Sequence, residues 1–151
     1  MGSDVPFFSE QTPVPVPMEL RRIISSTSET QDQHFLILKE TEGERSFPIM
    51  IGLYEVSSIE RRIRNMPSQR PLTHDLVVNV IEHLGGELSD ILINELREGT
   101  YFAKLRIRMN GELVEVDARP SDAIALAVST KVPIYVSEDV IEEATEDQGP
   151  F

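Results

Sequence analysis

The stretch YFAKLRIRMNGELVEVDA, residues 101–118, holds two runs of strand-forming residues on either side of Asn110-Gly111. This dipeptide between alternating apolar residues is the strongest short signal for a β-hairpin with a two-residue turn. The turn sets the register and predicts these cross-strand pairs: Leu105 with Val116 and Ile107 with Val114 on one face, Arg106 with Glu115 and Lys104 with Asp117 on the other. We therefore expect one apolar face toward the core and one face of paired charges.

The hairpin is followed by RPSDAIALAVST, residues 119–130, which predicts a helix over 121–130. Pro120 prevents the strand from continuing, and Ser121 is placed to cap the helix. Because AIALAV is apolar on every side, we expect this helix to be buried, either in the core or at a subunit contact.

Upstream of the hairpin, strand and helix patterns follow one another. Strands are expected at 18–25, 34–39, 45–51 and 88–96. Two amphipathic helices are expected at 52–65 and 73–84, the second capped by Thr73, with these apolar stripes: Leu53, Val56, Ile59 and Ile63 in the first, Leu76, Val77, Val80, Ile81 and Leu84 in the second. Downstream, residues 132–136 predict a short strand, and Ser137 is placed to cap a last acidic helix. The predicted fold class is α/β (α+β), with a mixed, largely antiparallel sheet and three to four helices in a single compact domain.

The ends of the chain differ from its middle. Residues 1–17 are rich in proline and predict a flexible leader, residues 18–144 form the predicted domain, and residues 145–151 predict a disordered acidic tail. No apolar run approaches the roughly 20 residues that span a bilayer, and residues 1–17 lack the basic-then-apolar layout of a signal peptide. We expect a cytoplasmic protein with no membrane partner.

The 151 residues include 14 Lys and Arg, 26 Asp and Glu, and no Cys. Without Cys, disulfides, thiolate metal sites and cysteine nucleophiles are excluded. The formal net charge of -12 argues at first against a nucleic-acid partner, because Lys and Arg supply most of the affinity for phosphates. However, most of this charge lies before residue 18 and after residue 137. The segment between them holds all 14 bases, including a cluster without acids that is a candidate contact for nucleic acid: Arg61, Arg62, Arg64 and Arg70.

Two groups of polar residues are candidates for chemistry. The first is His74-Asp75, at the predicted start of a helix, where imidazole and carboxylate can activate water or hold a divalent cation near a phosphate. An acid there is also explained by the helix dipole alone. The second group is Asp117, Arg119 and Asp122, where a strand meets a buried helix. Converging carboxylates suit Mg²⁺ or Mn²⁺, and an ion-pair scaffold explains them equally well.

Several stretches resemble the bifunctional nuclease (BFN) domain family over about residues 18–143. The stretches are FPIMIG (47–52), RPLTHDL (70–76), LREGTYFA (96–103), VDARPSDAIALA (116–127) and VPIYV (132–136). The resemblance implies a compact α/β domain, a homo-oligomer of two or more subunits, and nuclease activity on DNA and RNA. The polar positions within these motifs are candidates without assigned roles: His74, Asp75, Asp117, Arg119, Ser121 and Asp122.

We therefore expect a nuclease that hydrolyses phosphodiester bonds of DNA or RNA, assisted by Mg²⁺ or Mn²⁺. In this hypothesis Asp75, Asp117 and Asp122 hold metal or orient water, His74 transfers a proton, and Arg119 stabilises phosphate charge. The alternative is a non-catalytic homo-oligomeric binding or regulatory domain, in which the Asp and Arg residues form a structural network. The absence of a known nuclease motif favours this alternative, and no cofactor motif favours a small-molecule enzyme.

Overall fold

The computed structural model describes residue 8 and residues 14–30 and 32–146. Its elements follow in the order β1 (Pro15–Thr27), β2 (Asp32–Glu40), β3 (Ser46–Ile51), α1 (Leu53–Ile63), α2 (Thr73–His83), β4 (Gly86–Arg97), β5 (Thr100–Met109), β6 (Glu112–Ala118), α3 (Pro120–Thr130), β7 (Ile134–Ser137) and α4 (Glu138–Thr145).

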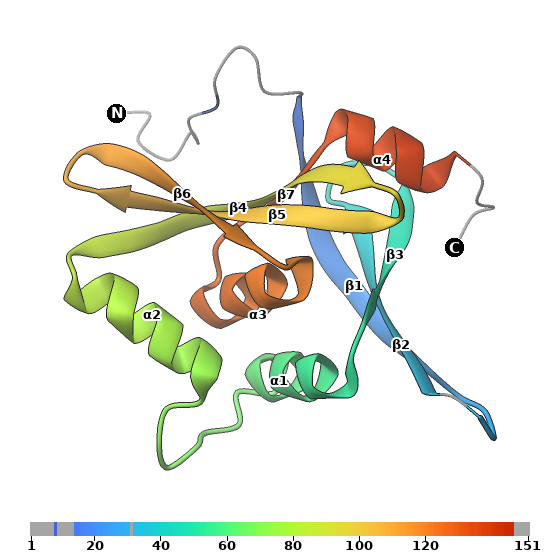
Figure 1. The fold of residues 1–151 in the computed structure, drawn as a ribbon, viewed down its shortest axis with the longest axis horizontal. Helices are drawn as coiled ribbons and strands as arrows, with labels where there is room; N and C mark the ends of the chain where they lie inside the picture. Colours follow the sequence, from blue (N-terminus) through green and yellow to red (C-terminus); the bar gives the residue numbers. More distant parts are fainter. Residues whose placement is uncertain (1–7, 9–13, 31, 147–151) are drawn as a thin grey trace.

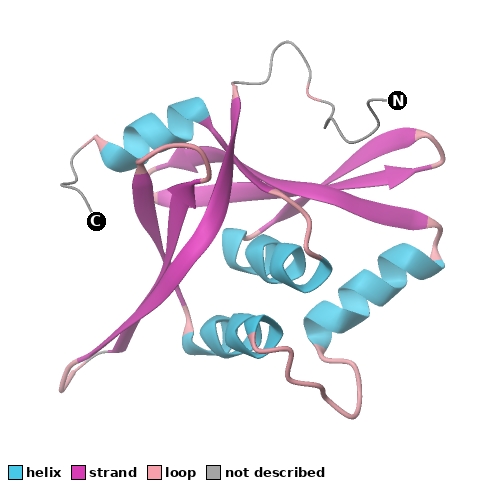
Figure 2. Cartoon of the chain, turned by 180° about the vertical axis from the view of Figure 1, so that it is seen from behind, coloured by secondary structure: helices cyan, strands magenta, loops and turns pink. Residues whose placement is uncertain are grey.

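All the strands join one sheet, in the order β3-β2-β1-β7-β4-β5-β6. Neighbouring strands are antiparallel except β4 and β7, which are parallel. The halves β1–β3 and β4–β6 cross at a steep angle, and α1, α2 and α3 gather on one side of the sheet (Figures 1 and 2). This arrangement confirms the predicted mixed, largely antiparallel sheet in a single α+β domain.

The β5–β6 hairpin has the register that its sequence predicts. Leu105 lies opposite Val116 and Arg106 opposite Glu115, around the Asn110-Gly111 turn. Asn110 and Gly111 have φ values of 53° and 77°, as a type I′ turn requires. The register places the polar end of β6 directly before α3.

Helix α3 lies in the angle between the two halves of the sheet (Figure 1). Its residues from Pro120 to Ala127 are buried except Asp122, and those from Ala123 to Ala127 belong to one core cluster with side chains of β2, β4, β5 and α4. Fully burying a Leu or Ile side chain contributes about 1.5–3 kcal/mol. The predicted burial of this helix is confirmed, and within one chain it is explained by the core.

Strand β1 begins at Pro15, three residues before the predicted start of the domain. Proline lacks an N–H, but its carbonyl can still pair. The Pro17 carbonyl accepts a hydrogen bond from the Thr41 amide at 3.1 Å, and the Val14 carbonyl accepts one from the Glu138 amide at 2.8 Å. The predicted flexibility of the leader and of the tail concerns mainly residues 1–7, 9–13 and 147–151, which lie outside the described residues.

Both amphipathic helices bury less of their apolar stripes than the sequence predicts. In α1, Val56 and Ile59 are buried, whereas Leu53 and Ile63 are exposed. No residue of α2 is fully buried. Its side chains Val77 and Ile81 are half-buried against the core, whereas these are exposed: Leu76, Val80 and Leu84. The reason is position, because α2 lies at the rim of the sheet rather than inside its angle (Figure 1).

Two of the predicted helix caps are also wrong. The N-cap residue of α2 is Leu72 rather than Thr73, and that of α3 is Arg119 rather than Ser121. Ser137 does occupy the N-cap position of α4, although its hydroxyl makes no capping bond. Among the helices of the described residues, none has the length and the apolarity that a membrane crossing needs.

Candidate functional site

Polar side chains of α1, α2 and α3 form a chain of hydrogen bonds where the three helices meet. His74 lies between two partners: its Nδ1 atom is 2.8 Å from Ser58 Oγ, and its Nε2 atom is 2.9 Å from Asp122 Oδ1. Ser58 Oγ also accepts a hydrogen bond of 2.8 Å from Arg62 Nη1. Because a guanidinium only donates, we assign the Ser58 hydroxyl hydrogen to His74 Nδ1. The imidazole hydrogen is then on Nε2, facing Asp122.

Arg119 continues this chain toward solvent. Its Nε atom is 2.9 Å from Asp122 Oδ2, its Nη2 atom is 3.4 Å from Glu55 Oε1, and 66% of its side chain is exposed. Burial raises the pKa of Asp122, but the hydrogen bonds from Arg119 and His74 outweigh it and hold this pKa below its ordinary value. Asp122 is therefore ionised at neutral pH.

Asp75 stabilises the start of α2. Its Oδ2 atom accepts a hydrogen bond of 2.9 Å from the Leu72 amide, and its Oδ1 atom is 3.1 Å from Arg62 Nη2. A carboxylate at this position satisfies a free amide of the first helical turn. The Arg62 side chain is only 7% exposed, so this ion pair also ties α1 to α2.

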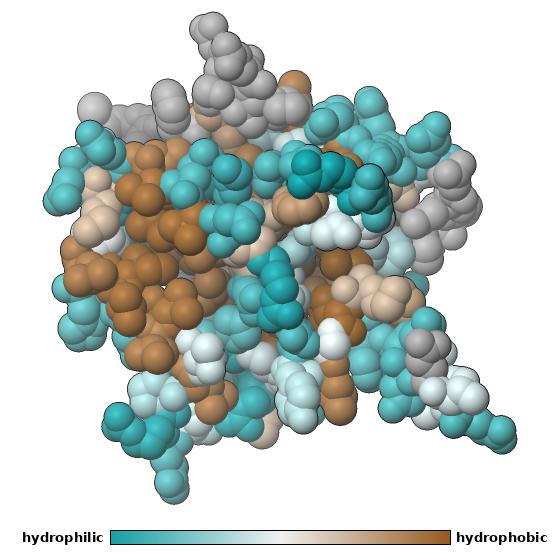
Figure 3. All heavy atoms as spheres, viewed as in Figure 1, coloured by the Kyte–Doolittle hydropathy of each residue, from teal (hydrophilic) through white to brown (hydrophobic). Residues whose placement is uncertain are grey.

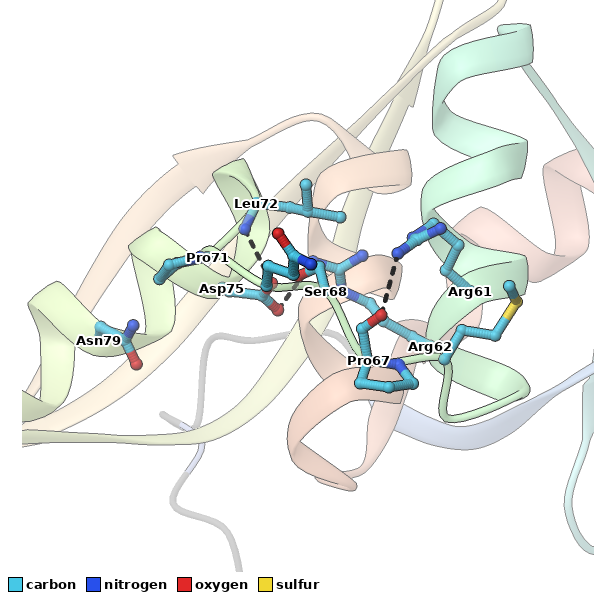
Figure 4. Close-up of a pocket in the computed structure, with 10 residues that line it drawn as sticks. Arg61, Arg62, Pro67, Ser68, Pro71, Leu72, Asp75 and Asn79 are labelled. Atoms are coloured by element: carbon cyan, nitrogen blue, oxygen red, sulfur yellow. Dashed lines mark hydrogen bonds and ion pairs between the residues drawn. The ribbon is translucent and has the colours of Figure 1, made fainter.

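A cavity of about 410 Å³ lies beside Arg62 and Asp75, at the loop between α1 and α2. In Figure 4, arginines from α1 and polar residues from α2 surround it. We call it the Arg61 cavity, and its lining is Arg61, Arg62, Met66, Pro67, Ser68, Gln69, Pro71, Leu72, Asp75 and Asn79.

A second cavity of about 790 Å³ lies on the Arg119 side of the hydrogen-bonded chain. Most of its wall is apolar and comes from β3 and from the turn between β4 and β5, while Glu55, Arg119 and Ser121 supply polar groups. The hydrogen-bonded side chains that run from Arg62 to Arg119 therefore connect a polar cavity with a mainly apolar one.

The structure brings some of the predicted catalytic residues together and separates others. His74, Asp122 and Arg119 are in direct contact, and Asp75 joins them through Arg62 and Ser58. Asp117 is exposed on β6, opposite Lys104, and alternation along the strand points it away from the face that bears Val116.

The four predicted nucleic-acid contacts do not share one surface. Arg61 and Arg62 line the Arg61 cavity, and Arg62 is almost fully buried in its ion pair with Asp75. Arg64 lines a different groove, beside Arg21 and Arg22 of β1. Arg70 is exposed in the loop before α2.

The predicted metal ligands Asp75, Asp117 and Asp122 do not gather around one point. Among the described residues, no group of three or more His, Asp or Glu side chains is arranged to hold a metal ion. The Asp75 and Asp122 carboxylates already accept hydrogen bonds from Arg62 and Arg119. This donor set does not fit Mg²⁺ or Mn²⁺ within one chain, and we derive no step through a metal.

Two members of the hydrogen-bonded chain, Glu55 and Ser58, were not among the predicted site residues. Together with Arg62 they lie on one side of α1 at positions i, i+3 and i+7. This spacing was visible in the sequence, but a polar stripe on an amphipathic helix usually faces solvent. Here it faces α2 and α3.

Comparison with known proteins gives consistent matches. A sequence model described as "Bifunctional nuclease domain" matches residues 36–148. An uncharacterized protein of Mycobacterium tuberculosis is 40% identical over 126 residues, which are 83% of this chain and 75% of that protein. Bifunctional nuclease 2 of Oryza sativa subsp. japonica is 33% identical over 112 residues, 72% of this chain and 34% of that protein. Bifunctional nuclease 1 of Arabidopsis thaliana is 34% identical over 107 residues, 68% of this chain and 33% of that protein.

Proposed function

Because the chain belongs to the bifunctional nuclease domain family, we propose that it hydrolyses phosphodiester bonds of DNA or RNA. The observation that carries this proposal is the contact of His74 with Asp122, beside the exposed guanidinium of Arg119. An imidazole held by a carboxylate next to an exposed cationic group is the arrangement that proton transfer to or from a phosphate ester needs.

In the proposed reaction, a water oxygen attacks the phosphorus atom and the bond to the leaving oxygen breaks. The Ser58 hydroxyl, which already donates to His74 Nδ1, passes its hydrogen to this nitrogen as it takes up the proton of the water, and the Asp122 carboxylate stabilises the imidazolium. The leaving oxygen departs with the bonding electron pair and is protonated by solvent. Arg119 stabilises the charge that develops on the phosphate oxygens. Arg64 and Arg70, both exposed, contact the strand backbone. Assistance by Mg²⁺ or Mn²⁺ stays a prediction for the assay.

The test is a digestion assay with end-labelled single-stranded DNA and RNA, with and without EDTA. His74→Ala should lower the rate about 100-fold or more, the usual contribution of a general acid or base. The matched control is His83→Ala at the end of the same helix, where the imidazole bonds the Asn79 carbonyl and lies outside the hydrogen-bonded group around His74. A folded His74→Ala protein that cuts as fast as the His83→Ala protein would remove His74 from the mechanism. Loss of cutting in EDTA, restored by Mg²⁺ or Mn²⁺, would support metal assistance.

A second candidate is a non-catalytic binding or regulatory domain. It is favoured by the saturation of the hydrogen-bonded chain, since both ring nitrogens of His74 and both oxygens of Asp122 already have protein partners. This candidate predicts that the purified wild-type protein binds oligonucleotides without cutting them under any metal condition.

We also propose that the protein forms a homo-oligomer, at least a dimer, through an apolar face of α2 and β6. Figure 3 shows this face as a broad hydrophobic area over these two elements. Its members are between 40% and 67% exposed, and we call them the α2/β6 face: Leu72, Leu76, Val80, Leu84, Val114 and Val116. Together they expose on the order of 500 Å² of apolar surface, near the upper end for a monomer.

A second copy of this chain is the partner that fits the α2/β6 face. The face combines a helix stripe with the edge strand of the sheet, so the stripe of one subunit can cover the strand of the other and the reverse. With a polar rim, two such faces approach the roughly 800 Å² per partner of a standard interface.

A further inference from the structure

Two neighbouring arginines have buried donor atoms without acceptors. Four buried side-chain nitrogen or oxygen atoms lack a hydrogen-bond partner among the described residues, and two of them are Nε of Arg61 and Nε of Arg62. Both arginines line the Arg61 cavity, whereas the other two atoms belong to Asn94 and Ser137, which do not line it. Buried N–H groups are normally paired, so two unpaired ones at one cavity point to a missing acceptor.

The charge around the Arg61 cavity favours an anion as this acceptor. Two guanidinium groups face one carboxylate, Asp75, which is already bonded to Arg62 and to the Leu72 amide. The amide side chains of Gln69 and Asn79 and the hydroxyl of Ser68 add neutral polar groups to the wall. The N-terminal turn of α2 begins at the rim and adds the positive end of a helix dipole.

Arg61 is the better placed of the two to bind a ligand. Its only hydrogen bond to the described residues is a long one, 3.5 Å from Nη2 to the Pro67 carbonyl (Figure 4). Arg62, in contrast, is fixed by Ser58 and Asp75. Because this one bond is weak, the planar guanidinium of Arg61 can still pair with a phosphate or carboxylate, whose geometry it matches.

We propose that the Arg61 cavity binds a phosphate monoester, either a free mononucleotide or the phosphorylated end of a nucleic-acid strand. A volume of about 410 Å³ exceeds that of a phosphate group and leaves room for part of a nucleoside. That the ligand is an anion follows from the two arginines. That it is a phosphate rather than a carboxylate rests on the proposed nuclease function.

The Arg61 cavity also touches the proposed catalytic group. Arg62 Nη1 donates to Ser58 Oγ, and Ser58 holds His74 Nδ1. A phosphate that binds Arg62 at Nε acts on the same guanidinium group that donates to Ser58. It can therefore alter the contact between Ser58 and His74. We therefore expect the environment of the His74 imidazole to change when a product or the end of a substrate strand binds in the Arg61 cavity.

The experiment is titration calorimetry on the full chain with a 5′-mononucleotide, inorganic phosphate, and a dinucleotide with and without a 5′-phosphate. Arg61→Gln should weaken mononucleotide binding at least tenfold, since it removes charge-assisted hydrogen bonds. The matched control, Arg22→Gln, removes the same charge from an exposed position of β1 outside the cavity and should change the affinity less than twofold. Arg61→Lys, which keeps the charge but loses the fork, should give an intermediate loss.

Equal losses in Arg61→Gln and Arg22→Gln would show unspecific attraction and overturn the proposal, as would no binding of any probe to folded wild type at millimolar concentration. Binding of the mononucleotide supports the free ligand as the source. Binding of only the phosphorylated dinucleotide supports the strand end. A shift of the His74 imidazole signals in the NMR spectrum on saturation would confirm the link through Ser58.

The two proposals can fail separately, because calorimetry needs no cleavage. Specific phosphate binding without hydrolysis would overturn the nuclease function and leave the Arg61 cavity as a binding site. Hydrolysis that depends on His74, without binding that depends on Arg61, would support the nuclease function and overturn the proposal that the Arg61 cavity binds phosphate.

Discussion

Helices α2 and α3 have the same length, 11 residues, and each supplies site residues from its first turn, but they are packed very differently. Seven residues of α3 are buried, whereas no residue of α2 is fully buried. The site therefore joins a helix fixed in the core, which carries Asp122, to a helix at the rim, which carries His74. A binding partner can therefore contact and move the exposed helix α2 far more readily than the buried helix α3.

Leucine truncation should give the largest difference between the two helices. Leu126 in α3 is 2% exposed and Leu76 in α2 is 55% exposed. Leu126→Ala should lower the free energy of unfolding by about 2–5 kcal/mol, because it leaves a cavity in the core. Leu76→Ala should change it by about 0.5 kcal/mol at concentrations where the protein is monomeric. Urea denaturation measures both, and equal costs would mean that α2 is as firmly packed as α3.

A charge on the rim helix tests whether a second copy covers it. Leu76→Glu should raise the dimer dissociation constant at least tenfold, because it places an unpaired carboxylate in the α2/β6 face. Leu53→Glu is the control, since Leu53 is 58% exposed on α1 outside this face. Sedimentation velocity reports the oligomeric state. If both variants associate as wild type does, the subunits do not meet at this face.

Breaking the contact between the two helices should have a smaller effect. Asp122→Asn should cost about 1–3 kcal/mol at neutral pH, since it weakens charge-assisted hydrogen bonds to His74 and Arg119. The folded pKa of Asp122 lies below its ordinary value of 3.8, so its contribution is complete above that pH and is lost as the pH falls through the lower folded pKa. Thermal melts from pH 7 to pH 2 should show the two proteins converging in acid. A constant difference down to pH 2 would contradict this account of Asp122.

The smallest effects are expected from the two hydroxyl residues in the first turns. Neither Thr73 nor Ser121 is an N-cap residue here, so Thr73→Ala and Ser121→Ala should each change stability by about 0.5 kcal/mol or less. Asp75→Ala should cost about 1 kcal/mol or more, because Asp75 bonds the Leu72 amide. A larger loss from Thr73→Ala than from Asp75→Ala would restore Thr73 as the cap.

Local signals in the sequence were sufficient for much of the fold. The turn at Asn110-Gly111 fixed the register of β5 and β6, because a two-residue loop leaves no freedom in the pairing. The apolar sequence of α3 predicted its burial. The stripe of Leu76, Val80 and Leu84 predicted a helix, but an apolar stripe cannot indicate whether its own core or another surface covers it.

The site was predictable only in part, because its contacts are distant in sequence. His74 and Asp122 were identified separately, each in the first turn of a helix, yet they are 48 residues apart and only the fold shows that they touch. Ser58 lies on the polar side of an amphipathic helix, a position that usually faces solvent and therefore does not indicate a contact with other helices. Asp117 and Asp122 are neighbours in sequence, but strand alternation and the start of α3 aim them in different directions.

The position of β7 has a consequence for the order of folding. Its four residues lie between β1 and β4 and form the link through which the halves β1–β3 and β4–β6 become one sheet. Until residues 134–137 are in place, β1 and β4 each present an open edge with unpaired backbone groups. The sheet is therefore completed by a strand that follows both halves in sequence, and an incompletely synthesised chain is the state most exposed to edge-to-edge aggregation.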